Sequence, residues 1–105
     1  MIVKIYHPSN SKGKVIAFTT RQESLQKCAK VLCKEFGGCT VQNSVGYYLS
    51  ETGDIIQEDI KILYSNVKKL SLKQKSIVRN LAFDVKYDLG QESVMIEFDN
   101  ESDFI

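Results

Sequence analysis

The segment from Gly37 to Glu58 constrains the fold of this chain more than any other. It begins with the pair Gly37-Gly38, which predicts the left-handed end of a helix, because glycine adopts positive φ at little cost. Residues 39–50 then alternate in the manner of a strand, and residues 51–54 (Glu-Thr-Gly-Asp) are typical of a tight turn. A second strand starts at Ile55. The segment therefore predicts a helix end followed by a β-hairpin.

Two helices are expected, one before this hairpin and one after it. Each is predicted to open with a capping box, in which a hydroxyl side chain stands three positions before a glutamate or glutamine. The two boxes are Thr20 with Glu23 and Ser71 with Gln74. Apolar residues follow each box at helical spacing. The first helix is expected to end at the glycine pair and the second at Gly90.

Alternating residues at 2–7 and 93–99 predict a strand near each end of the chain. The order strand, helix, strand, strand, helix, strand predicts an α+β fold, the ferredoxin-like βαββαβ sandwich, with a four-stranded antiparallel sheet and both helices on one face. Right-handed crossovers then require the strand order 4-1-3-2. Residues 1–100 are expected to form this single domain, and residues 101–105 an acidic C-terminal tail that frays.

The sheet face turned away from both helices has no covering element in this arrangement. Apolar and aromatic residues are expected on it, namely Tyr6, Tyr48, Leu63, Val67 and Met95. A face of this kind commonly packs against a second copy of the same chain. The sequence therefore predicts a homodimer that associates through the open sheet face.

The same topology places several polar side chains at one end of the sheet, where a small-molecule or protein partner would bind. They are His7, Tyr48, Glu58, Gln91 and Glu92. A histidine with carboxylates and a phenol can transfer a proton or orient a polar ligand. Glu58 interrupts a face of isoleucines, which indicates a β-bulge, a solvated edge residue or an inward carboxylate. An inward Glu58 would need a partner, and His7 is the nearest candidate. We therefore expect the pKa of His7 to be raised.

Composition excludes several classes of function. The net charge of +1 is too small to attract a polyanion. The lysine-rich second helix has few aromatic residues near it. Nucleic-acid binding is therefore not expected. No apolar run is long enough for a bilayer, and the N-terminus has the pattern of a strand and not of a signal peptide. The chain has three cysteines, and they form no CxxC motif: Cys28, Cys33 and Cys39. Neither a metal nor a cofactor is therefore expected. We expect the three thiols to be reduced and the protein to be cytoplasmic.

Several short motifs together resemble a pattern in short uncharacterised proteins of bacteria, archaea and their phages or plasmids. The motifs are Gly37-Gly38-x-Thr40, Gly46-Tyr47-Tyr48, Gly53 with Glu58-Asp59, and Leu89-Gly90-Gln91-Glu92-Ser93-Val94. Tyr48 stands where those proteins often have tryptophan. The resemblance implies a small ferredoxin-like domain and supplies no catalytic residues.

Two functions remain open from the sequence. The first is a non-enzymatic homodimeric binding module, in the manner of a phage or plasmid accessory protein that inhibits a partner or sequesters a ligand. The alternative is a small enzyme that uses His7 with Glu58 or Glu92 for proton transfer. The sequence contains no nucleophile motif, which favours the binding module.

Overall fold

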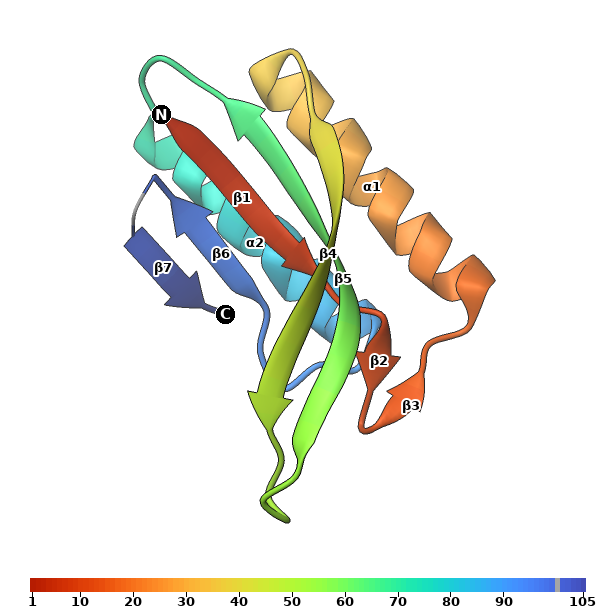
Figure 1. Ribbon diagram of the computed structural model, residues 1–105. Coiled ribbons are helices and arrows are strands. Elements are labelled where there is room, and N and C mark those ends of the chain that lie inside the picture. Colours follow the sequence, from red (N-terminus) through yellow and green to blue (C-terminus); the bar gives the residue numbers. More distant parts are fainter. Residues whose placement is uncertain (100) are drawn as a thin grey trace.

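The computed structural model of the protein describes residues 1–99 and 101–105. Its helices and strands are shown in Figure 1. They are β1 (Ile2–His7), β2 (Asn10–Ser11), β3 (Lys14–Val15), α1 (Phe18–Phe36), β4 (Thr40–Leu49), β5 (Ile55–Asn66), α2 (Leu72–Asp88), β6 (Met95–Phe98) and β7 (Glu101–Phe104).

The main sheet is antiparallel, and its described strands lie in the order β4-β5-β1-β6-β7. Helices α1 and α2 cover one face of this sheet (Figure 1). The fold is the predicted ferredoxin-like α+β sandwich. The order β6-β1-β5-β4 within the sheet is the predicted 4-1-3-2 arrangement.

The sheet has a fifth strand, which the sequence pattern does not predict. Strand β7 pairs with β6, with Met95 opposite Phe104 and Phe98 opposite Glu101. The N–H of Ile105 donates to the carbonyl of Val94 over 3.0 Å. The C-terminal segment is therefore an edge strand of the domain and not a frayed tail. Its acidic sequence concealed this, because the pairing rests on backbone hydrogen bonds, which carry no sequence pattern.

The helix ends agree with the sequence in part. Ser71 Oγ accepts the N–H of Gln74, and Gln74 Oε1 accepts the N–H of Ser71, both over 3.1 Å, so the second capping box is confirmed. The first box is wrong. Helix α1 begins at Phe18, so Thr20 lies within its first turn, and its N-cap is Ala17, with no side-chain cap.

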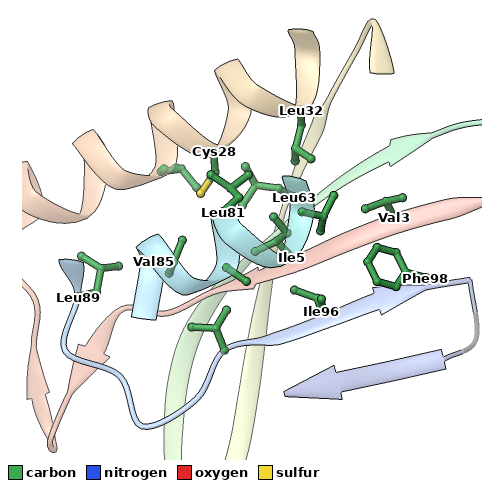
Figure 2. Packing of buried hydrophobic residues seen from close by; sticks show 14 residues of the cluster. Val3, Ile5, Cys28, Leu32, Leu63, Leu81, Val85, Leu89, Ile96 and Phe98 are labelled. Atoms are coloured by element: carbon green, nitrogen blue, oxygen red, sulfur yellow. The ribbon is translucent and has the colours of Figure 1, made fainter. Parts of the chain in front are cut away.

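The hydrophobic core lies between the helices and the sheet. Figure 2 shows Leu32 and Leu81 from the helices against Ile5, Leu63 and Ile96 from the strands. In the sheet Ile5 stands opposite both Leu63 and Ile96. Because these residues share the helix-facing side, β5 must turn its other set of side chains outward.

The expected orientation of β5 was therefore wrong. Leu63 is fully buried in the core, and Val67 packs against the core beyond the end of the strand, so neither belongs to the open face. The set of isoleucines that includes Ile60 and Ile62 lies on the open face instead, with Tyr64. The helix-facing side of β5 includes the polar residues Asp59, Lys61 and Ser65, so alternation indicated the open face as the buried one.

The hairpin of β4 and β5 extends past the helices, as Figure 1 shows. Its register is continuous from Thr40 opposite Tyr64 to Leu49 opposite Ile55, so no bulge interrupts it at Glu58. The outer part of the hairpin exposes large apolar side chains on both faces. These are Val45, Tyr47, Tyr48, Leu49 and Ile55. In the described residues, no helix is long and apolar enough to cross a membrane.

Candidate functional site at the end of strand β1

The side chain of Glu58 binds the backbone of the segment that follows β1. Its carboxylate oxygen Oε2 accepts the backbone N–H of Ser9 over 3.0 Å and that of Asn10 over 2.7 Å. Pairing of β1 with β5 ends at His7, so neither amide has a partner in β5. The half-buried carboxylate of Glu58 satisfies them both, and charge-assisted bonds of this kind are the stronger class.

Gln91 reaches the same loop from the other side. Its Nε2 atom donates to the carbonyl of Asn10 over 2.7 Å and to that of Leu89 over 3.1 Å. Ser11 Oγ also donates to the carbonyl of Gly90 over 2.9 Å. The structure thus brings Glu58 and Gln91 together, as the topology predicted, with the loop from Ser9 to Ser11 held between them.

His7 lies on the opposite side of the sheet from Glu58. It is fully buried on the helix-facing side, and its Nε2 atom lies 2.9 Å from Oγ of Ser24 in α1. Burial, reinforced by the positive charge of Arg21, lowers the pKa of His7 to about 4. The expected ion pair with Glu58 and the expected rise of the histidine pKa are therefore both wrong. Strand alternation explains this, because His7 follows Val3 and Ile5 inward.

Tyr48 and Glu92 lie at the edge of this region. Tyr48 stands opposite Ile56 on the open face and is 44% exposed. It is a diagonal neighbour of Glu58, which stands opposite Gly46, and such neighbours lie within reach of an aromatic side chain. Glu92 is exposed in the segment before β6. Neither side chain forms a hydrogen bond within the described part of the chain.

The open face carries a second carboxylate, Glu97, which is not among the site residues predicted from the sequence. Tyr6 Oη donates to Glu97 Oε1 over 2.6 Å. Burial, with the hydrogen bond to Glu97, raises the pKa of Tyr6 to about 12. The alternation of Ile96, Glu97 and Phe98 could have predicted this position. Ile96 and Phe98 point toward the core, so Glu97 points to the open face. The open face therefore combines two acidic groups with aromatic and apolar side chains.

A hollow of about 380 Å³ lies on the helix-facing side, beside the start of α1. The residues that line it were not selected from the sequence. They are Arg21, Asn43, Ser44, Val45, Asp59, Ile60 and Lys61. Within the ranges 1–99 and 101–105, no cluster of three or more histidine, cysteine or acidic residues is placed to hold a metal ion.

No family model matches the chain, and no curated protein is significantly similar to it in sequence. Several solved structures are similar to this chain in fold. A phage SAM lyase in complex with S-methyl-5'-thioadenosine has a TM-score of 0.71 and 17% identity, over 99% of this chain and 87% of that one. The apo state of a phage SAM lyase has a TM-score of 0.67 and 18% identity, over 99% and 86%. CutA from Pyrococcus horikoshii, in the presence of 3 M guanidine hydrochloride, has a TM-score of 0.50 and 16% identity, over 99% and 82%. At these identities the likeness shows the shared fold.

Proposed function

We propose that the protein binds an adenosine-type thioether or sulfonium ligand, such as S-methyl-5'-thioadenosine (MTA) or S-adenosylmethionine (SAM), and that it cleaves SAM. The observation that carries the proposal is the carboxylate of Glu58, held by two backbone amides beside Tyr48 at the end of the open sheet face. The likeness in fold to a phage SAM lyase in complex with MTA, over 99% of this chain, supports it.

The chemistry of the proposed site suits such a ligand. A sulfonium is a cation with little hydrogen-bonding capacity, so a fixed carboxylate and the faces of aromatic rings are its natural partners. Glu58 supplies the first, and Tyr48 supplies a ring that either adenine or the sulfonium can contact. Gln91 and Glu92 would offer polar contacts to the ribose. His7 is buried on the other face and takes no part in direct contact.

The proposed reaction balances without water or an oxidant. The bond between the sulfonium sulfur and Cγ of the methionine portion breaks, and its electron pair remains on sulfur as neutral MTA leaves. The four-carbon remainder either closes its own carboxylate onto Cγ, giving a lactone, or loses its β-proton to a base. Ring closure needs no protein nucleophile, which agrees with a sequence that has no such motif. Elimination would use Glu58 or Glu92 as the base.

Self-association is the second element of the proposal. The open face exposes or half-buries Ile56, Ile60 and Ile62, and the outer hairpin is apolar on both of its faces. Apolar surfaces of this kind are normally covered by a partner. A second copy packed there would enclose the exposed ring of Tyr48 and remove the ligand from water, with a homodimer as the simplest such assembly.

The test combines binding with turnover. The purified protein is titrated with MTA and with SAM by calorimetry, and SAM incubations are analysed by chromatography and mass spectrometry for MTA and for the four-carbon product. Glu58→Gln should lose turnover by at least about a hundredfold, as expected for an electrostatic group at the reacting centre. Glu101→Gln, an exposed acid on β7, is the matched control.

The outcomes separate the two functions that the sequence left open. Release of MTA from SAM supports the enzyme, and the four-carbon product distinguishes ring closure from elimination. Binding of MTA or SAM without turnover leaves a ligand-sequestering module and removes the lyase activity. If neither compound binds at millimolar concentration, the whole proposal is wrong.

A further inference from the structure

The hollow beside α1 is lined by two cationic side chains that are held in place by hydrogen bonds to neutral oxygen atoms. Arg21 Nε donates to the carbonyl of Pro8 over 3.0 Å, and Arg21 Nη2 donates to the carbonyl of Asp59 over 3.5 Å. Lys61 Nζ donates to Oδ1 of Asn43 over 2.7 Å. These bonds position both cations before any ligand arrives, which reduces the entropy lost on binding.

Neither cation is held by an acidic side chain in the part of the chain that the structure describes. Arg21 and Lys61 form no ion pair within the described residues, where the ion pairs involve Lys27 and Arg79. All the partners of Arg21 and Lys61 named above are neutral oxygens, so these hydrogen bonds do not offset the two positive charges. The carboxylate of Asp59 also lines the hollow and leaves it with a net charge of about +1.

Donors remain available after these internal bonds are counted. Within the described chain, Nη1 of Arg21 has no hydrogen-bond partner, and Lys61 Nζ uses one of the three protons of its ammonium group. Asn43 turns its Oδ1 toward Lys61, which leaves its Nδ2 group as a further donor. Guanidinium, ammonium and amide donors around one hollow match the acceptors of an oxyanion.

We propose that this hollow, with Arg21, Lys61 and Asn43 as its donors, binds a small oxyanion, either a carboxylate or a phosphate group. The site is separate from the one around Glu58, because Lys61 and Glu58 lie on opposite faces of β5. Val45 in its lining is exposed, so the oxyanion can be the terminal group of a larger ligand whose apolar part contacts this side chain. The proposal does not depend on the proposed cleavage of SAM.

His7 offers a built-in reporter for this site. It is the only histidine of the chain, and it stands opposite Lys61 on the same face of the sheet. An anion beside Lys61 will change the electric field at its ring. We therefore expect saturable shifts of the His7 ring resonances, and of the Asn43 and Lys61 amides, when inorganic phosphate or acetate is added at constant ionic strength with chloride as the reference.

Variants of opposite charge sign make the test specific. Lys61→Gln and Arg21→Gln should each weaken binding by about tenfold, whereas Asp59→Asn should tighten it, since its carboxylate repels the anion. Asp59 contacts Arg21 through its backbone carbonyl, so this substitution preserves the hydrogen bond. Lys69→Gln, an exposed residue outside the hollow, makes the same charge change as Lys61→Gln and should leave binding unchanged.

Two results would overturn the proposal. One is a set of shifts that grows linearly with phosphate and acetate, as expected for non-specific ionic effects. The other is an equal loss of binding in Lys69→Gln and Lys61→Gln, which would mean that net charge alone decides. If the shifts saturate, the tighter of the two probes identifies the preferred group, carboxylate or phosphate.

Discussion

The Nε2 atom of His7 and the Oγ atom of Ser24 lie 2.9 Å apart, and they join the end of β1 to α1 inside the protein. Both residues are buried, and the Nδ1 atom of His7 has no hydrogen-bond partner within the described residues. A proton added to this ring would place a charge in the interior beside Arg21 and Lys61. The neutral imidazole is therefore the form that the fold stabilises.

This arrangement predicts acid sensitivity. Burial, with the nearby Arg21 charge, lowers the pKa of His7 from 6.5 to about 4. Below pH 6.5 the unfolded chain binds a proton that the folded chain does not, so the contribution of His7 is complete above that pH and is lost as pH falls toward 4. The loss amounts to about 3 kcal/mol. Urea unfolding as a function of pH, compared with His7→Asn, isolates this contribution from those of the carboxylates.

A direct titration checks the same point. The ring resonances of His7 in the folded protein should show no protonation at pH 6 and should titrate near pH 4. An ordinary midpoint close to 6.5 would mean that the ring is solvated or that an acid faces it. Only a midpoint clearly above 6.5 would support the ion pair with Glu58 that the sequence suggested.

Glu58 is expected to hold the loop that follows β1. Glu58→Ala leaves the N–H groups of Ser9 and Asn10 without their acceptor, and Ser9 is buried. The free energy of unfolding should fall by about 1–3 kcal/mol, the typical cost of leaving such groups unsatisfied. Hydrogen exchange at these two amides should accelerate well beyond the change in global stability. Equal protection in the variant and the wild type would show that water or another group serves them equally well.

Met95 tests which surface mediates self-association. It lies on the open face in β6, two residues before Glu97 and opposite Phe104 of the edge strand β7. Met95→Glu places a charge on that face, so light scattering should show a smaller assembly than for the wild type. Leu72→Glu is a suitable control, because Leu72 is equally apolar and 84% exposed but lies on α2. If Met95→Glu keeps the wild-type mass, the interface lies on the outer hairpin or elsewhere.

The sequence predicted those parts of the fold that short-range signals encode. Ser71 and Gln74 form the expected cap, and the hairpin turn lies where residues 51–54 placed it. Alternation in β1 identified Val3 and Ile5 as one face. From these elements, the handedness of the crossovers was enough to order the four predicted strands.

The remaining features depend on contacts between distant segments. The open face of β5, with Ile56, Ile60 and Ile62, is more apolar than its helix-facing side, so the alternation pointed to the wrong face, and only packing of Leu63 against Ile5 shows which one is buried. Strand β7 has no pattern that a sequence reader would recognise. The partner of Glu58 proved to be backbone N–H groups, and the identity of a backbone donor never appears in a sequence. The cationic hollow around Arg21 and Lys61 could not be predicted for the same reason, because backbone carbonyls hold Arg21 in place.

The glycine pair after α1 provides a final test, because the structure separates two residues that the sequence treats alike. Gly37 has φ of 84°, and its N–H donates to the carbonyl of Cys33 over 2.8 Å, which closes the helix. Gly38 has no positive φ, and a Cβ at either position would meet no atom within 4 Å. Sterics therefore play no part, and only the left-handed backbone penalises a side chain, by about 1 kcal/mol. Gly37→Ala should lower the thermal midpoint by several degrees, whereas Gly38→Ala should leave it within about one degree or raise it slightly by restricting the unfolded chain. Equal losses in both variants would show that the helix ends differently in solution.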